Sequence, residues 1–162
     1  QRLENTAMLE REITLRFLAE PAMVNFGGKM HGGSVMKWID QAGYTCAVGW
    51  SGQYCVTVYV GGIRFYKPIF IGHLVEVRAK IIYTGNTSMH VAVDVFSRDP
   101  KHNDMVKNTH CIIVFVAVDE HGTAIAVPAW QPQTDEDQSL QRYATRLMDL
   151  RHAIDDEMRD HL

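Results

Sequence analysis

The residues most able to do chemistry lie in the segment HGGSVMKWID at residues 31–40. Two glycines and a serine precede apolar residues at helical spacing, which predicts a helix that begins near Gly32. Asp40 follows Met36 by four residues and precedes Gly43 by three, so it is expected on the buried side of that helix. An unpaired carboxylate is costly to bury, and in a cleft it is a candidate general base or nucleophile. The alternative is that Asp40 reaches the edge of the face and pairs with a nearby Lys or Arg.

The glycines that precede this acid predict a place for a carbonyl oxygen. The first N–H groups of a helix have no internal partners and carry a partial positive charge. With Gly32 and Gly33 there, an acyl oxygen could approach the backbone closely, as in an oxyanion hole. Asp40 lies roughly 10 Å further along the helix axis. One substrate reaches both only if its reactive centre lies between them or a partner subunit contributes, although a glycine pair can also serve only a turn or tight packing.

The remaining pattern predicts an α+β fold in which one long helix faces an antiparallel sheet of five to six strands. The helix is expected to run to about Val48 and to end near Gly49. Alternating or continuously apolar runs predict strands joined mostly by hairpins, and TGN at 84–86 predicts one hairpin turn. The expected strands lie at 12–18, 54–60, 74–82, 88–96 and 110–118, with a short edge strand at 123–127.

Beyond Pro132 the chain becomes charged and its pattern predicts a C-terminal helix, with acidic residues near its start that suit the helix dipole. Apolar residues there recur at steps of three and four. They are Leu140, Tyr143, Leu147, Leu150, Ile154 and Met158. This stripe either packs on the chain's own domain or forms an oligomer contact. The sequence therefore divides into a domain at 1–130 and a helical extension at 131–162.

Composition narrows the classes of function. The 162 residues carry a formal net charge of −3 with a pI of about 6.2, which argues against a nucleic-acid binder. No apolar run is long enough to span a bilayer. Cys46, Cys55 and Cys111 lack CxxC spacing and have apolar neighbours, so they are expected in the core of a cytoplasmic protein. The eight histidines lack HxH or HExxH spacing, and no metal site is expected.

An ordered series of motifs resembles the hotdog-fold acyl-CoA thioesterases. HGG followed by Asp40 matches the HGG…D pattern of that superfamily. Further runs resemble bacterial acyl-CoA hydrolases related to the long-chain cytosolic type, over about residues 10–128. These runs are NFGGKMHGG at 25–33, QAGYTCA at 41–47, YCVTVYV at 54–60, KPIFIGHLVEV at 67–77 and YTGNTSM at 83–89.

This resemblance implies a hotdog fold in which an antiparallel sheet wraps a long helix. It also implies a homo-oligomer, in which two protomers join their sheets, share active sites at the interface and often assemble as trimers of dimers. The implied reaction, part of fatty acid metabolism, is hydrolysis of acyl-CoA to free acid and CoA, without a separate cofactor. The implied domain at 1–130 is the hotdog thioesterase domain.

The resemblance also implies roles for individual residues. Asp40 is the catalytic carboxylate, acting as base on water or as nucleophile at the thioester carbonyl, and the backbone of Gly32 and Gly33 holds the carbonyl oxygen. His31 shapes the loop or, as the alternative, takes a direct part in catalysis. Lys29 departs from the family, where Asn or Asp usually stands two residues before the motif histidine. Either Asp40 works alone with Lys29 as an electrostatic helper, or activity is weakened; Asn25 has the wrong spacing for a simple replacement.

Coenzyme A brings phosphates, for which basic residues and a turn rich in donors are candidate contacts. These candidates are Arg64, Lys67, Thr84, Gly85, Asn86, Thr87 and Ser88. An ordinary strand end or hairpin explains them about as well. Two other functions stay open: a hotdog dehydratase or hydratase that uses His31 with Asp40, and a non-catalytic sensor of acyl-CoA or CoA, which Lys29 suggests.

Overall fold

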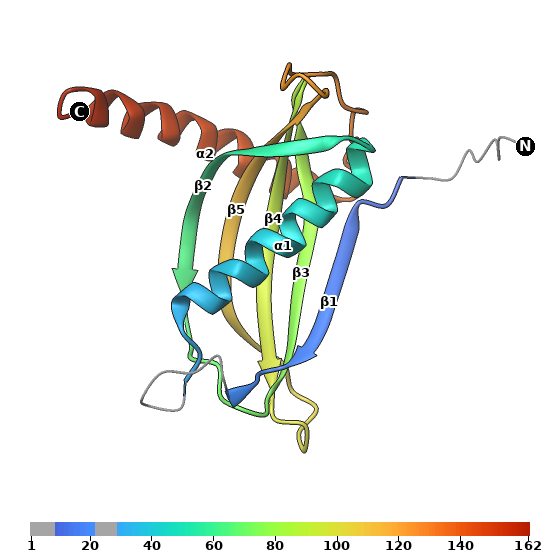
Figure 1. Ribbon diagram of the computed structural model, residues 1–162, viewed down its shortest axis with the longest axis vertical. Coiled ribbons are helices and arrows are strands. Elements are labelled where there is room, and N and C mark those ends of the chain that lie inside the picture. The colour runs from blue at the N-terminus through green and yellow to red at the C-terminus, as the bar shows by residue number, and fades with distance from the viewer. Residues whose placement is uncertain (1–8, 22–28) are drawn as a thin grey trace, which may run out of the picture.

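The computed structural model describes residues 9–21 and 29–162, and its five strands and two helices form three layers (Figure 1). The elements are β1 (Glu12–Leu18), α1 (Gly32–Ser51), β2 (Tyr54–Phe65), β3 (Leu74–Thr84), β4 (Ser88–Arg98), β5 (Val106–Val118) and α2 (Asp135–Arg159). All neighbouring strands pair antiparallel in one sheet of order β1-β3-β4-β5-β2. The predicted α+β class, with one long helix against an antiparallel sheet, is confirmed. Asn25 lies outside the described residues.

The two helices cover opposite faces of the sheet, as Figure 1 shows. Alternation along β5 makes this plain: Cys111 and Ile113 join the core under α1, whereas Ile112 between them packs under α2. The continuous apolar run of this strand therefore reflects burial on both faces, as the sequence predicted. Neither helix in the described ranges is long and apolar enough to cross a bilayer.

Helix α1 ends later than the sequence indicated. Its last residue is Ser51, because Gly52 adopts a left-handed φ of 67° and donates its N–H to the Val48 carbonyl at 2.8 Å. Gly49 lies inside the helix, so the prediction of an end there was wrong. The extra turn buries Trp50, whose Nε1 donates to the Pro128 carbonyl at 2.8 Å. Tertiary contact at this tryptophan thus outweighs the stop signal of a glycine.

The predicted edge strand at 123–127 does not form a sixth strand. It makes only one isolated bridge, between Ala124 and Val118, although Ile125 also donates its N–H to the Ala117 carbonyl. Strand β5 already pairs with β4 on one side and β2 on the other, so it has no free edge for another long partner. Strand β2 is itself an edge strand and leaves one row of backbone groups unpaired by its own sheet.

The three cysteines are free and buried, as predicted. Burial raises the pKa of the Cys46 thiol to about 12 and that of Cys111 to about 11. At neutral pH both are protonated, so they act as small apolar residues and not as nucleophiles.

Candidate active site

The N-terminus of α1 is open to solvent at its two glycines. Gly32 and Gly33 are exposed, and a Cβ built on either meets no atom within 4 Å. Neither residue has the positive φ that favours glycine. Within the described chain, neither packing nor backbone conformation requires glycine here. Open space over a first helical turn suits a group that comes from outside the protomer.

No side chain of the described protomer neutralises this helix terminus. His31 is the N-cap and its backbone carbonyl accepts from the Val35 N–H at 3.2 Å, but its exposed side chain makes no capping hydrogen bond. The first turn holds no acidic residue. The partial positive charge of the terminus is therefore left for an external oxygen or anion.

A cavity of about 240 Å³ borders this terminus. It forms between the start of α1 and the segment after β2. The Met30 N–H donates to the Ile69 carbonyl at 3.0 Å and so connects these two parts of the chain. The lining residues are Met30, Gly32, Val35, Phe65, Tyr66, Lys67, Pro68, Ile69 and Thr109. Two residues predicted from the sequence, Gly32 and Lys67, thus line one cavity, which combines apolar walls with a cation and a helix N-terminus.

Asn108 positions the wall that carries Lys67, and sequence reasoning missed it. This side chain is 1% exposed, and its Nδ2 donates to the carbonyls of Lys67 at 3.3 Å and Pro68 at 3.0 Å. The backbone carbonyl of Asn108 accepts from the Tyr66 N–H at 2.7 Å. The available signal was an asparagine two residues before the predicted strand at 110–118, where a polar residue needs a partner once buried.

Asp40 is exposed in the protomer, so the expectation that it faces the packed side was wrong. The buried residues of α1 are Val35, Trp38, Ile39, Ala42, Gly43, Cys46, Ala47 and Trp50. Asp40 follows Ile39 and is turned about 100° from it, which places it at the margin of the face. Among the described residues it forms no ion pair either, so the alternative of a Lys or Arg partner is not observed. It does not line the cavity at Gly32.

The predicted CoA turn lies at the other end of α1. It comprises Thr84, Gly85, Asn86, Thr87 and Ser88. Thr84 Oγ1 accepts from the Trp130 N–H at 2.9 Å, and Pro128 in the same segment accepts from Trp50 near the helix C-terminus. Because α1 spans 20 residues, or roughly 30 Å, this turn and the N-terminal glycines do not meet within one protomer.

Arg64 and Lys29 are also separate from the cavity lining. Arg64 pairs in register with His110, whose ring contacts Tyr143 of α2. Directly opposed residues share a face, so Arg64 lies on the α2 side of the sheet. Lys29 is exposed and bridges Phe70 through its backbone, next to the cavity. Of the predicted CoA contacts, only Lys67 lines the cavity at Gly32.

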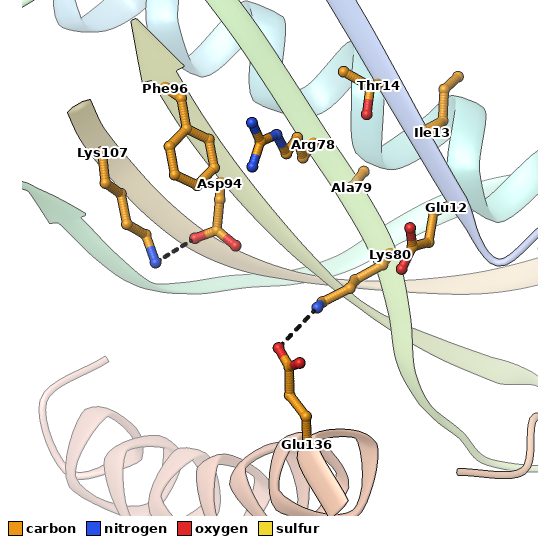
Figure 2. Close-up of a pocket in the computed structure, with 10 residues that line it drawn as sticks. All are labelled: Glu12, Ile13, Thr14, Arg78, Ala79, Lys80, Asp94, Phe96, Lys107 and Glu136. Carbon is orange, nitrogen blue, oxygen red and sulfur yellow. Dashed lines mark ion pairs between the residues drawn. The ribbon is translucent and has the colours of Figure 1, made fainter. Parts of the chain in front are cut away.

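A larger cavity of about 400 Å³ lies on the α2 side of the sheet (Figure 2). Its charges largely pair with one another: Lys107 Nζ lies 2.9 Å from Asp94 Oδ1, and Lys80 Nζ lies 3.6 Å from Glu136 Oε1. Arg78 stacks over Phe96 at 4.1 Å. This cavity has no concentrated field of one sign and holds none of the predicted site residues. Among the described side chains, no group of three His, Cys, Asp or Glu is placed to hold a metal ion.

A long helix against a five-stranded antiparallel sheet of this order defines the hotdog class of folds, and known proteins agree. A family profile described as "Thioesterase superfamily" matches residues 27–102. Protein VdlD of Helicobacter pylori is 33% identical over 132 residues, which cover 82% of this chain and 74% of that protein. The acyl-CoA thioester hydrolase YciA of Escherichia coli is 31% identical over 120 residues, covering 72% and 91%.

Solved structures extend the likeness over almost the whole chain. An acyl-CoA hydrolase from Staphylococcus aureus, in complex with butyryl coenzyme A and coenzyme A, matches with a TM-score of 0.85 and 26% identity over 92% of this chain and 91% of that one. A hexameric acyl-CoA thioesterase matches with a TM-score of 0.86 and 29% identity over 90% and 94%. The chain belongs to the hotdog-fold thioesterase superfamily, which confirms the resemblance inferred from its motifs.

Proposed function

We propose that this protein is an acyl-CoA thioesterase that hydrolyses acyl-CoA to a free carboxylic acid and CoA, with no separate cofactor. Its family is the thioesterase superfamily, and YciA of Escherichia coli and the hydrolase from Staphylococcus aureus are both named as hydrolases of acyl-CoA. The observation that carries the proposal is the open N-terminus of α1 at Gly32 and Gly33, which borders a cavity and shares its helix with an exposed Asp40. Thioester hydrolysis is accelerated by a site that binds the carbonyl oxygen and by a base or nucleophile, which a carboxylate can supply.

In the proposed reaction, backbone N–H groups at Gly32 and Gly33 bind the thioester carbonyl oxygen. As base, Asp40 takes a proton from water while the water oxygen adds to the carbonyl carbon, and the C–S bond then breaks. As nucleophile, an Asp40 oxygen adds to the carbonyl carbon and the C–S bond breaks to leave a mixed anhydride, which water hydrolyses to the free acid and the regenerated carboxylate. In both routes CoA leaves as a thiolate that takes up a proton. Lys67 in the cavity wall would attract the CoA phosphates, and Lys29 supplies positive charge close by.

Completion of this site by a second protomer is part of the proposal. Asp40 does not line the cavity at Gly32, and both are open to solvent. The unpaired edge of β2 exposes Val56, Val58 and Val60, which suits pairing with the same strand of another copy. Such a dimer would bring a carboxylate from one subunit to the glycines of the other. Trimers of these dimers would give a hexamer, the state of one structural neighbour. The cytoplasmic location stays a prediction.

The test is thiol release from acyl-CoAs of short to long chain. Asp40→Ala is expected to lower kcat by at least about 100-fold, because general base or nucleophilic catalysis contributes that much. The neighbouring exposed residue supplies the control, since Gln41→Ala alters α1 without removing the carboxylate. Lys29→Asn, measured beside them, shows whether this lysine helps or weakens turnover.

Other outcomes of this assay would select another function. An Asp40→Ala enzyme with unchanged kcat on every acyl-CoA would defeat the proposal. Hydration of an enoyl-CoA without release of thiol would identify a hydratase. Tight acyl-CoA binding without turnover by the wild type would identify a sensor.

A further inference from the structure

Helix α2 crosses the outer face of the sheet from β3 to β2 and continues past the β2 edge (Figure 1). Near its start Glu136 pairs with Lys80 of β3. Tyr143 then hydrogen-bonds His110 of β5 at 2.9 Å. Finally Arg151 lies over the Tyr59 ring of β2 at 4.9 Å. Because β2 is the last strand on that side, the rest of α2 has no strand of its own sheet beneath it.

The apolar stripe of α2 nevertheless continues beyond that edge. Leu147 packs against the sheet, and Leu150, Ile154 and Met158 follow at steps of three and four on the same side of the helix. These three side chains are 58%, 51% and 49% exposed in the protomer. A helix end surrounded only by solvent would not need apolar residues in line with the face of α2 that packs on the sheet.

The neighbouring edge strand exposes apolar side chains as well. Fourteen large hydrophobic residues of the described chain are exposed, and nine of them belong to β2 or to the end of the chain from Leu150 onward. They are Tyr54, Val56, Val58, Val60, Phe65, Leu150, Ile154, Met158 and Leu162. Such a concentration on two adjacent elements is typical of an interaction surface and not of scattered surface residues.

We propose that the stripe of Leu150, Ile154 and Met158 packs on the sheet of a second copy of this chain that is joined at β2. This inference rests on the homo-oligomer proposed above. The occupant is a second copy because pairing of two β2 edges continues the sheet beneath the overhanging helix. The eight residues after Arg151 extend α2 by roughly 12 Å, enough to cover about two strands of the partner at their usual spacing.

Two-fold symmetry gives this contact a defined role in the oligomer. The two α2 helices would cross the junction of the paired β2 strands (the seam) in opposite directions. The outer side of the seam is therefore covered by two helices, one from each protomer. On its other side lie the α1 helices, which carry Asp40 and the N-terminal glycines. The proposed shared sites therefore depend on a seam that α2 helps to hold closed.

A charge placed in the stripe tests the contact. The double variant Ile154→Glu/Met158→Glu is expected to raise the dimer dissociation constant at least about tenfold, measured by analytical ultracentrifugation across a dilution series. Ala153→Glu is the control, since it adds one exposed acid to the same helix roughly a third of a turn away from the stripe. Far-UV circular dichroism and thermal melting of each variant show whether the protomer still folds.

Amide hydrogen exchange of the wild type gives a second measurement that needs no variant. Residues 152–159 are expected to exchange slowly in the oligomer and quickly after dilution, because an overhanging helix alone frays. Fast exchange at every concentration would overturn the proposal, as would a double variant that dissociates like Ala153→Glu. A double variant that still forms dimers but no larger assemblies would mean that the stripe contacts a copy other than the β2-joined partner. That result would also overturn the proposal. Failure of thiol release would leave these measurements unaffected.

Discussion

The two helices lie on opposite faces of one sheet, but they are held in different ways. Helix α1 rests on the main apolar core, to which seven of its eight buried residues belong. Helix α2 covers a cluster of only four buried residues and is oriented by polar contacts. These include Arg11–Asp137, His110–Tyr143 and Arg151–Tyr59. Apolar burial tolerates small shifts, whereas hydrogen bonds and ion pairs specify one crossing path.

The polar contacts on the α2 side form connected groups. His110 Nδ1 lies 2.7 Å from Asp94 Oδ1, and Lys107 pairs with the same carboxylate. Burial raises the pKa of Asp94, but its bonds to His110 and Lys107 outweigh burial and leave the pKa below its usual value. The α2 side should therefore respond to charge and pH, while the α1 side responds to packing.

The largest expected effect on this comparison comes from Asp137→Ala. Asp137 Oδ1 lies 2.6 Å from Arg11 Nη1, and both side chains are largely buried. Removing the acid leaves Arg11 with only the exposed Glu12, at 3.9 Å, as an acidic neighbour. The loss should cost about 3 kcal/mol in the free energy of unfolding. Urea denaturation measures this cost. Asp135→Ala, an exposed acid in the same helical turn, should cost only a few tenths of a kcal/mol. Equal losses in the two variants would contradict a polar anchor.

Acid should loosen the α2 side next. His90 is 3% exposed beneath α2, and burial, with the charge of Arg151, lowers its pKa from 6.5 to about 4. Below pH 6.5 the unfolded chain binds a proton that the folded chain refuses, so stability falls as pH falls. The expected loss is about 2 kcal/mol between about pH 7 and about pH 5.

The control for this acid effect is His90→Leu, which has similar volume and no titratable group. Its free energy of unfolding should be flatter over the same range, because carboxylates such as Asp137 have pKa values held below their usual range and lose their contribution only at lower pH. For Asp137, burial opposes ionisation, and bonds from the Gln133 N–H and Arg11 outweigh it. An unchanged slope in the variant would assign the acid sensitivity to other groups.

The smallest expected change in stability comes from replacing a glycine of α1 by alanine, and its size and sign differ between Gly33 and Gly43. Gly33→Ala meets open space and should raise the free energy of unfolding by a few tenths to about 1 kcal/mol, through helix propensity. Thiol release should nevertheless fall about tenfold, because a methyl group would crowd the proposed carbonyl site. Gly43→Ala is the comparison, since its Cβ would lie 3.2 Å from both Ile113 and Phe115. A Gly33→Ala enzyme with full activity would argue against the proposed oxygen site.

Local patterns predicted most of the elements. The alternation in β3 and β4 gave their start points correctly, and the break in apolar spacing at the HGG motif located the start of α1. These signals survive because strand and helix periods are properties of neighbouring residues. The wrong end of α1 shows the limit: burial of Trp50 against Pro128 is a long-range contact that no local stop signal contains.

By itself, the sequence determined the α+β class, the family and the residues most able to do chemistry, because these depend on residue types at fixed spacing. Only the tertiary structure decided that Asp40 is exposed in the protomer, that Lys67 joins Gly32 at one cavity and that Asn108 holds that cavity's wall. It also decided that β2 is the edge over which α2 protrudes. Each of these features depends on contacts between residues far apart in the sequence. The spacing of residue types along the chain does not specify such contacts.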